Sequence, residues 1–367
     1  MKIAALVHID LDFWARRRVL VTGHTGFKGA WLSLWLQSLG AELTGLATGV
    51  PTRPSLYELA GVGEHMRAHA LDVRDARAVR EAVAGARPEV VLHLAAQPMV
   101  RRSLREPALT YELNVMGTVN VLEAVRQAGE DVQAVVVVTS DKCYENPGQR
   151  THRFAEDDPL GGADPYSSSK ACAELVTSAY RRSFFSGDGP LLATARAGNV
   201  IGGGDWGEDR LVPDAVRAVQ DGTALRVRNP HAVRPWQHVL SPLAGYLRLA
   251  EALSLGEPGA ARAWNFGPPA HDERPVSWVV ARLAELWEGE LAWELDQGVN
   301  PPEAQHLALD SADAERELRW QASCDLDAAL GLTVAWHRAA RQGHDMREVS
   351  LAQIAHIGEL DRHVGAT

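Results

Sequence analysis

The hydrophobic positions in the first half of the chain form short apolar runs that alternate with stretches of helical spacing. Runs rich in valine, leucine and alanine predict strands at 18–21, 42–46, 66–70, 90–94, 134–139 and 191–196. Helices are predicted to start near Ala30, Asp75, Pro107 and Pro165. Because strands joined by crossover helices run parallel, this alternation predicts an α/β fold with a doubly wound parallel sheet.

The pattern changes after about Gly198. Glycine, proline and tryptophan become more frequent, as in 202–206 and 234–236, and the helical stretches lose their regular spacing. We therefore expect two domains: residues 1–197 with a returning segment near 232–255, and a smaller mixed α/β lobe formed mainly by 198–367. Such a lobe would close over a ligand at the carboxyl ends of the strands.

Composition narrows the range of partners. Of the 367 residues, 46% are hydrophobic and 23% are charged, and the net charge of −10 argues against nucleic acid or an anionic membrane as the partner. The three cysteines are scattered and form no Cys-x-x-Cys pair, which favours a reducing compartment without a disulfide framework or a zinc site. No apolar run approaches membrane-spanning length, and the first residues lack the features of a signal peptide. A cytoplasmic protein without a metal site is expected.

The most informative motif follows the first predicted strand. Glycines at 23, 26 and 29, in Gly23-His-Thr-Gly-Phe-Lys-Gly29, stand between that strand and a helix. Their spacing allows a tight turn, lets a pyrophosphate approach bare backbone and lets the helix pack closely on its strand, while the helix N-terminus favours an anion. An ordinary glycine turn is the alternative, but the strand–turn–helix context indicates a dinucleotide site in a Rossmann-like domain. The expected cofactor contacts in this loop are Gly23, His24, Thr25, Gly26, Phe27 and Lys28.

Polar and small residues follow the later strands. Asp72 and Val73 follow the third predicted strand, where the carboxylate could accept a hydrogen bond from adenine or could instead cap the next helix. Small residues after the fourth strand would let a cofactor lie against backbone. The stretch 139–142, Thr-Ser-Asp-Lys, brings together hydroxyl, carboxylate and ammonium groups, either for catalysis or as a polar turn with an internal ion pair. Further cofactor contacts are expected from Leu94, Ala95, Ala96, Gln97, Asn114 and Thr139.

The pattern Tyr166-Ser-Ser-Ser-Lys170 indicates catalysis most strongly. Asp164 and Pro165 form a helix start, and residues four apart share one helix face, so the ammonium of Lys170 is expected near the phenol of Tyr166. A nearby cation and an oxidised nicotinamide would lower the pKa of Tyr166 from about 10 and favour the phenolate. Tyr-x-x-x-Lys alone occurs in many helices by chance; the preceding glycine-rich turn and Thr-Ser-Asp strand end make it specific here.

Together these motifs resemble those of the extended short-chain dehydrogenase/reductase family, over about residues 18–336. Within that family, the stretches 23–29, 139–142 and 234–238 are similar to the branch of nucleotide-sugar 4,6-dehydratases that acts on CDP-glucose. The segments 196–206 and 309–318 fit the same branch.

The resemblance implies a lyase that uses NAD without net oxidation. In such enzymes C4 of the sugar is oxidised, water is eliminated across C5 and C6, and hydride returns to C6, which gives CDP-4-keto-6-deoxyglucose for deoxysugar biosynthesis. It implies that Tyr166, supported by Lys170, is the base at O4, that Asp141 is the acid for the C6 hydroxyl and that Ser140 donates a hydrogen bond to O4. The alternatives are a 4-epimerase, a dehydratase for another nucleotide sugar, or a non-catalytic dinucleotide sensor. The intact Tyr166–Lys170 pair argues against the sensor.

Two positions depart from the family pattern. Lys142 stands where the related dTDP-glucose dehydratases carry glutamate, so the C5 base stays open: Lys142 could act deprotonated, stabilise the enolate, bind the cofactor or orient Asp141. The sequence 47–49, Ala-Thr-Gly, stands where an acidic residue normally holds the NAD ribose, and Lys28 and Arg53 could attract a 2′-phosphate. The resemblance therefore implies NAD, while the local residues leave NADP open.

The second half of the chain carries the expected substrate contacts. An arginine side chain suits a pyrophosphate because its fork is bidentate and permanently charged, although Arg228 and Arg234 could instead form ion pairs between the lobes. The expected substrate contacts are Gln97, Asn199, Leu211, Arg228, Arg234 and His238. The helical stretches 107–127 and 165–182 carry apolar residues on more than one face, and the resemblance suggests that they pair in a homodimer, with a homotetramer as the alternative.

Overall fold

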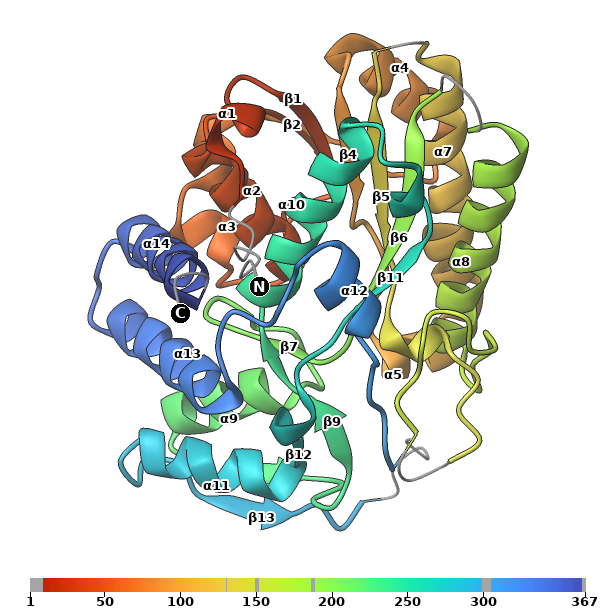
Figure 1. The fold of residues 1–367 in the computed structure, drawn as a ribbon. Helices are drawn as coiled ribbons and strands as arrows, with labels where there is room; N and C mark the ends of the chain where they lie inside the picture. The colour runs from red at the N-terminus through yellow and green to blue at the C-terminus, as the bar shows by residue number, and fades with distance from the viewer. Residues whose placement is uncertain (1–8, 130, 149–151, 186–188, 299–304, 365–367) are drawn as a thin grey trace, which may run out of the picture.

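A seven-stranded parallel sheet forms the centre of the chain (Figure 1). The computed structural model describes residues 9–129, 131–148, 152–185, 189–298 and 305–364. The strand order is β11-β6-β5-β4-β1-β2-β3, so the connections change direction beside β1, and ligands of doubly wound sheets bind at such a point. The strands of this sheet are β1 Arg18–Thr22, β2 Glu42–Ala47, β3 Arg67–Ala70, β4 Val90–His93, β5 Ala134–Val138, β6 Leu191–Ala197 and β11 Ala263–Phe266. The fold class predicted from the sequence is confirmed.

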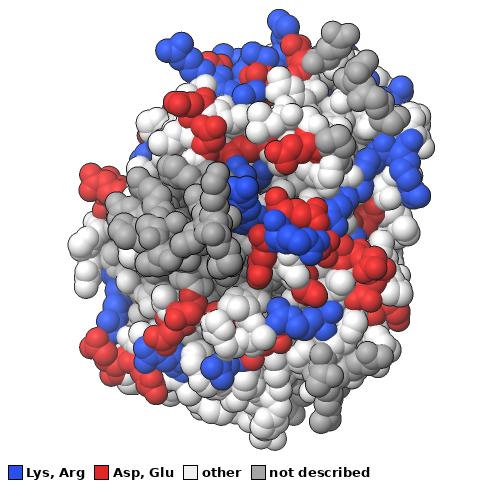
Figure 2. All heavy atoms as spheres, viewed as in Figure 1, with Lys and Arg blue, Asp and Glu red and all other residues white. Residues whose placement is uncertain are grey.

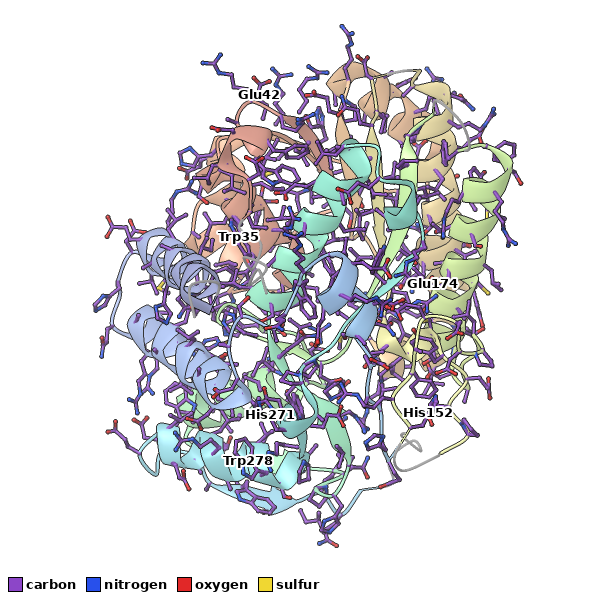
Figure 3. All side chains as sticks on the ribbon, in the orientation of Figure 1. Trp35, Glu42, His152, Glu174, His271 and Trp278 are labelled. Atoms are coloured by element: carbon purple, nitrogen blue, oxygen red, sulfur yellow. The ribbon has the colours of Figure 1, made fainter. Side chains whose placement is uncertain are left out.

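Helices cover both faces of this sheet. On one face, α2 (Phe27–Ser38) and α10 (Leu240–Ser254) pack against the strands in one buried cluster, into which Trp35 projects from α2 (Figure 3). On the other face, α4 (Ala76–Ala86), α7 (Gly117–Gln127) and α8 (Pro165–Ser183) form a second cluster with the strands. Two of these helices start as predicted, because Asp75 and Asp164 accept hydrogen bonds from first-turn amides of α4 and α8. α2 begins three residues before the predicted Ala30, since Gly26 is its N-cap.

The stretch predicted as one helix from Pro107 contains three segments. α6 (Pro107–Tyr111) passes into a π-helical turn, η2 (Glu112–Met116), and then into α7. α7 starts at Gly117, where an added Cβ would lie 2.8 Å from Cγ2 of Val73, so the helix packs closely on the loop after β3. A π-helical turn inside an α-helix often marks a functional position, and this one carries Asn114.

The second half of the chain forms its own buried cluster. α9 (Leu211–Asp221), α11 (Val276–Leu286) and α13 (Leu326–Arg341) pack around Trp287 together with β8 (Leu225–Val227). Three small sheets lie in this half: β7 (Val200–Ile201) with β10 (Gln237–His238), β9 (Val233–Pro235) with β12 (Glu273–Pro275), and β8 with β13 (Trp293–Leu295). α10 and β11 return from it to the main sheet. The domain boundaries given above stay a prediction.

The remaining elements are short, except for the long helix α14 (Met346–Val364), which packs on α13 and α2. The short ones are α1 Leu11–Trp14, α3 Leu56–Leu59, η1 Val62–His65, α5 Val100–Arg105, η3 Asp141–Cys143, η4 Pro258–Ala260, η5 Ala270–Asp272 and α12 Ala312–Glu317. Acidic and basic side chains are interspersed over the face shown in Figure 2. Among the described residues, no helix combines the length and the apolar character needed to cross a membrane.

Candidate active site

The glycine-rich loop joins β1 to α2 at the switch point of the sheet. Gly23 has a φ of +74°, and a Cβ there would lie 2.8 Å from the backbone nitrogen of Ala95 after β4. A Cβ on Gly29 would overlap the carbonyl oxygen of Gly23, so this glycine lets α2 pack on its own turn. Around Gly26 the nearest atom to a Cβ lies 3.4 Å away, and no side chain caps the helix there. The loop therefore leaves bare backbone and a helix N-terminus free for an anion.

The other loop residues predicted to contact the cofactor lie at different depths. Thr25 donates a hydrogen bond to the carbonyl of Gly49, 2.6 Å away, and so ties the loop to the segment after β2. His24 is buried, lies edge-on to Tyr57, and has its pKa lowered to about 4 by burial. Phe27 lies against Gly202, where a Cβ would be 3.3 Å from the ring.

Two of the residues predicted after β3 and β4, Asp72 and Gln97, have side chains that are hydrogen-bonded to other protein groups. Asp72 accepts from the backbone and side chain of Arg74, at 2.9 and 2.7 Å, while Asp75 is the helix cap, so the capping alternative for Asp72 is wrong. Val73 is buried in the cluster beneath α7. The amide of Gln97 is buried; it donates to Met99 and Thr110 and accepts from Met99. Leu94, Ala95 and Ala96 present small side chains or backbone at the carboxyl end of β4.

Asn114 links three parts of this region. Its Oδ1 accepts from the backbone nitrogen of Gln97 at 2.8 Å, and its Nδ2 donates to the carbonyl of Gln97 at 3.1 Å and to Oγ of Ser169 at 2.8 Å. Ser169 lies on α8, between Tyr166 and Lys170. The π-helical turn thus fixes the end of β4 relative to the helix with the Tyr-x-x-x-Lys pattern.

A short turn at the carboxyl end of β5 places the candidate acid. Oγ of Ser140 donates to Oδ1 of Asp141 at 2.9 Å and accepts from the backbone nitrogen of Lys142 at 3.2 Å. The other oxygen of Asp141, Oδ2, is buried without a hydrogen-bond partner among the described residues. Burial raises the pKa of Asp141, while Lys142, Ser140, Lys28 and Arg234 act to lower it. The net effect favours the protonated carboxyl, a group able to donate a proton.

Tyr166 and Lys170 lie on α8 beside this turn. Both side chains are buried, and the hydroxyl of Ser140 lies close enough to Tyr166 to act on its pKa. Burial raises the pKa of Tyr166 to about 12, against the lowering by Lys170 that the spacing predicted. The Nζ of Lys170 donates instead to the carbonyl of Val138, 3.1 Å away, and the cation that acts on the tyrosine is Arg210. Burial also lowers the pKa of Lys170 to about 8.

The structure adds neighbours that the sequence did not indicate. Arg210 caps α9 and pairs with Asp205 at 3.0 Å, yet its charge acts on both Tyr166 and Lys28. Gly198 has no Cβ to crowd Asp141: such an atom would lie 2.9 Å from Oδ2. Only the approach of the second half of the chain to the strand ends reveals these contacts, although the glycine stands in the segment 196–206 that carried the family resemblance.

Lys28 lies among the catalytic candidates. Its Nζ is 6.0 Å from the centre of the Tyr246 ring, and burial together with the charges of Arg210 and Lys170 lowers its pKa to about 7 against the opposing effect of Asp141. Arg53, the second cation considered for a 2′-phosphate, pairs with Glu58 at 3.1 Å on the surface.

Apart from Gln97, the predicted substrate contacts differ in their surroundings: two are buried, one forms an ion pair and two are partly exposed. Arg234 is buried close enough to Asp141 to lower its pKa. Arg228 pairs with Asp209 at 3.3 Å, and Asp209 also pairs with Arg101 of α5 at 3.4 Å, so the ion-pair alternative for Arg228 holds in this structure. His238 is buried edge-on to Trp31, with its pKa lowered by burial to about 3. Asn199 and Leu211 lie partly exposed, after β6 and at the start of α9.

Comparison with known proteins shows a relationship over nearly the whole chain. The family model described as GDP-mannose 4,6 dehydratase matches residues 20–332. A CDP-glucose 4,6-dehydratase of Salmonella typhimurium is 47% identical over 352 residues, which cover 95% of this chain and 98% of that protein. A dTDP-glucose 4,6-dehydratase of Mycolicibacterium smegmatis is 28% identical, over 88% of this chain and 93% of the relative.

Solved structures agree with this relationship. The dTDP-glucose 4,6-dehydratase DesIV of Streptomyces venezuelae, solved with NAD bound, superposes with a TM-score of 0.76 at 25% identity and covers 90% of this chain and 99% of that one. A UDP-glucose 4-epimerase of Thermus thermophilus in complex with NAD has a TM-score of 0.76 at 27% identity, over 88% of this chain and 99% of that one.

Proposed function

Because the chain belongs to the GDP-mannose 4,6-dehydratase family, we propose that it is an NAD-dependent nucleotide-sugar 4,6-dehydratase that converts CDP-glucose to CDP-4-keto-6-deoxyglucose. The 47% identity to a CDP-glucose 4,6-dehydratase supports CDP-glucose as the substrate. The observation that carries the dehydratase chemistry is Asp141, whose buried carboxyl keeps one oxygen without a partner beside Ser140 and Tyr166.

The cofactor is NAD, and the residues at the switch point fit it. The space at Gly26 and the uncapped start of α2 suit the pyrophosphate, and the small side chains of Ala95 and Ala96 suit a flat ring at the end of β4. When bound, NAD accepts hydride from C4 of the sugar and returns it to C6. NAD has no 2′-phosphate, so Lys28 is not needed to bind one. Its charge interacts instead with Asp141, Arg210 and Lys170, which places it near the reacting groups.

Tyr166 removes the proton from O4 of the sugar. Burial holds its pKa near 12, so the base needs neighbouring positive charge, which Arg210 supplies. We expect the ammonium of Lys170, on the same face of α8, to add to it when substrate and cofactor are bound. The hydroxyl of Ser140, which donates to Asp141 in this structure, turns to donate to O4 of the bound sugar and orients it.

Asp141 protonates the hydroxyl that leaves C6. Its raised pKa favours the protonated carboxyl, and Oδ2 has no hydrogen-bond partner among the described residues. A 4-epimerase has no leaving hydroxyl and no use for such an acid. The position of Asp141 therefore favours elimination.

The nucleotide half of the substrate would lie under the second half of the chain. Arg234 is close to Asp141, and Arg228 exchanges Asp209 for the substrate diphosphate. The protein acts as a homodimer through the faces of α5, α6, η2 and α8, where Leu104, Tyr111, Met116 and Leu175 are exposed. Three cysteines without a disulfide fit a reducing cytoplasm.

Mass spectrometry tests this function. The purified protein is incubated with CDP-, dTDP-, UDP- and GDP-glucose, and each product is examined for the loss of one water. We expect the loss with CDP-glucose, at a higher kcat/KM than with the other three. An absence of water loss with all four sugars would show that the protein is not a dehydratase of this kind.

A further inference from the structure

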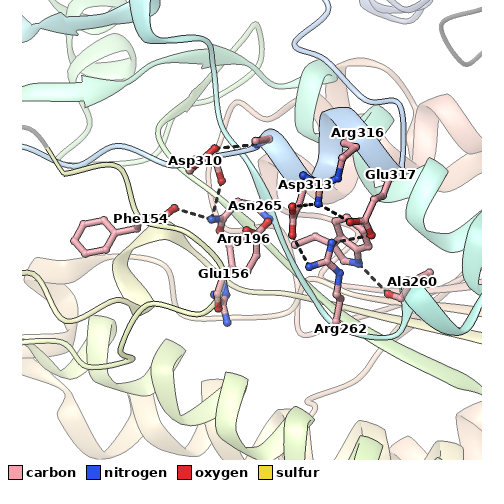
Figure 4. Close-up of polar contacts among 12 residues, drawn as sticks. Phe154, Glu156, Arg196, Ala260, Arg262, Asn265, Asp310, Asp313, Arg316 and Glu317 are labelled. Carbon is pink, nitrogen blue, oxygen red and sulfur yellow. Dashed lines mark hydrogen bonds and ion pairs between the residues drawn. The ribbon is translucent and has the colours of Figure 1, made fainter. Parts of the chain in front are cut away.

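One buried ion pair holds both ends of the turn that carries Ser140 and Asp141. At the start of the turn, Oγ1 of Thr139 donates to Glu174 of α8. At its end, the hydroxyl of Tyr144 accepts from Arg196 of β6 at 2.6 Å. Glu174, labelled in Figure 3, pairs with Arg196, labelled in Figure 4, at 2.8 Å.

The pair is buried and bonded to several neighbours, while Nε of Arg196 has no partner among the described residues. Its side chains are 3% and 4% exposed, and Glu174 also accepts from Thr194 at 2.7 Å. Arg196 donates further to the carbonyl of Glu156 at 3.0 Å. Replacing a buried pair by apolar groups is often neutral or stabilising, so its cost in desolvation points to a role other than stability.

Helix α8 holds the end of β5 at two successive residues. Lys170 donates to the carbonyl of Val138, and Glu174, one helical turn further on, accepts from the side chain of Thr139. Residues four apart share a helix face, so the ammonium and the carboxylate lie on the same side of α8. A shift of Glu174 would therefore move the turn and, at the same time, change the position of Lys170 relative to the end of β5.

The charges around Lys170 make Glu174 its balancing group. Lys28 from α2 is near enough for the two cations to interact, and His93 from β4 feels the charge of Lys170. Glu174 from α8 favours the charged ammonium, whereas burial raises the pKa of Cys143 from η3 well above its usual value, so that its thiol carries no charge. Arg196 and Thr139 in turn keep Glu174 ionised.

We propose that the Glu174–Arg196 pair is a positioning unit for the reaction: it fixes the turn 140–142 against Tyr166 and supplies the negative charge that balances the buried ammonium of Lys170. The role in turnover rests on the proposed function. Glu174 acts through Thr139, which donates to it, and through Lys170, whose charged form it favours.

The test removes both charges of the pair. Because a single Glu174→Gln change would leave Arg196 buried and unpaired, the variant is Glu174→Gln/Arg196→Gln in the NAD-loaded protein. Without the carboxylate, Lys170 loses its proton at lower pH, so the alkaline limb of the kcat profile with CDP-glucose moves down by about one pH unit or more. We also expect kcat to fall at least tenfold while KM changes less. A folded variant with an unchanged alkaline limb would overturn the proposal.

A matched control separates this effect from the loss of any buried pair. Glu251 on α10 is buried, pairs with Arg248 and accepts from the indole of Trp14, away from the turn. Glu251→Gln/Arg248→Gln should lower the melting temperature without moving the pH profile. A shift of equal size in this control would show that the effect on Lys170 is not specific to Glu174.

Lysine NMR gives a readout that needs no substrate. The chain has four lysines, at 2, 28, 142 and 170, so [ε-13C]lysine labelling gives few signals, and a Lys170→Arg sample assigns the one of interest. We expect its titration midpoint to fall in the Glu174→Gln/Arg196→Gln protein and to stay in place in the control. Inactivity of the wild-type protein with CDP-glucose would refute the proposed function, while an unshifted Lys170 signal would refute the balancing role.

Discussion

The carboxyl of Asp141 meets two opposed physical demands. A donor of a proton near neutral pH needs a raised pKa, and burial provides it. The same burial leaves Oδ2 without a partner, which costs free energy of folding. Burial of Asp141 thus serves catalysis and lowers the stability of the fold at the same time.

Asp141→Asn tests the functional side of that conflict. The amide cannot protonate the leaving hydroxyl, so elimination should slow by at least about a hundredfold, the usual range for a lost general acid. Oxidation at C4 does not use Asp141, so reduced cofactor should still form and accumulate. Stopped-flow absorbance of the reduced nicotinamide measures the rate of C4 oxidation, and mass spectrometry of the product measures the rate of water loss. Comparing the two rates separates oxidation from elimination. Equal slowing of both would remove Asp141 from the acid role.

The same variant should be more stable than the wild-type protein at alkaline pH. The folded state raises the pKa of Asp141, so it holds the proton more tightly than the unfolded chain does. That contribution to stability is complete below the unfolded pKa and is lost as pH rises through the folded one. Asparagine does not ionise. The variant's advantage in unfolding free energy should therefore grow with pH, to roughly 1–3 kcal/mol, and thermal melts at several pH values measure it. An advantage that does not depend on pH would contradict the raised pKa of Asp141.

Tyr166→Phe should abolish turnover and leave the fold intact. Phenylalanine fills nearly the same volume and loses only the hydroxyl of this buried side chain. The loss of kcat should exceed about a thousandfold if the phenol is the base, with the melting temperature changed by only a few degrees. Circular dichroism and the water-loss assay measure the two quantities. Retained activity would mean that another group takes the O4 proton.

Among the elements, the turn from β1 to α2 separates the roles of its glycines. A Cβ at Gly29 would overlap the carbonyl of Gly23, whereas a Cβ at Gly26 would lie no closer than 3.4 Å to its nearest neighbour. Gly29 therefore serves the packing of the cofactor-free fold. Gly26 keeps open the space above the helix N-terminus.

Alanine substitutions at the two positions should differ accordingly. Gly26→Ala should change the unfolding free energy of the cofactor-free protein by less than about 0.5 kcal/mol, yet weaken NAD binding at least tenfold, about 1.4 kcal/mol. Gly29→Ala should lower stability by about 1–3 kcal/mol or more through overpacking and weaken binding as well. Calorimetric titration and thermal melts measure both. Unaltered NAD binding by Gly26→Ala would place the pyrophosphate elsewhere.

The elements also show how far the sequence alone can lead. Apolar runs identified β1, β4 and β5, because strands covered on both faces admit few polar residues. β3, at one edge of the sheet, is exposed at all four positions and is not such a run. β11 is four residues long at the sheet edge, and its Asn265 is held by Phe154 and Asp310, far along the chain (Figure 4). Such a strand has no local pattern to recognise. The π-helical turn at Asn114 likewise interrupts a helix that periodicity alone joins.

In the site, too, local patterns predicted the contacts that lie close in sequence and missed those that the tertiary fold creates. Helical spacing placed Tyr166 and Lys170 on one face of α8, and strand ends placed Ser140 and Asp141 beside them. Arg210 comes close only because α9 folds back over the strand ends, a tertiary contact that no local spacing encodes.

For the whole molecule, an exposed apolar surface on one side of the fold suggests how two copies meet. Leu104, Tyr111, Met116 and Leu175 are 37–59% exposed on neighbouring α5, α6, η2 and α8. These elements also carry Asn114, Tyr166 and Lys170 on their buried side. A contact that covers the outer side would stiffen the scaffold of the site.

Charges on this surface should separate the copies. In a twofold dimer each substitution occurs twice in one interface, so Met116→Glu/Leu175→Glu would bury four like charges, and we expect the protein to become monomeric in sedimentation velocity. Both side chains are exposed in the single chain, at 50% and 59%, so the substitutions should not disturb its own packing. Any fall in melting temperature should therefore come from the loss of the dimer contact. Leu255→Glu is the matched control, because Leu255 is 70% exposed beyond the end of α10 and should leave the mass unchanged. A wild-type monomer, or a double variant that stays dimeric, would rule out this surface as the interface.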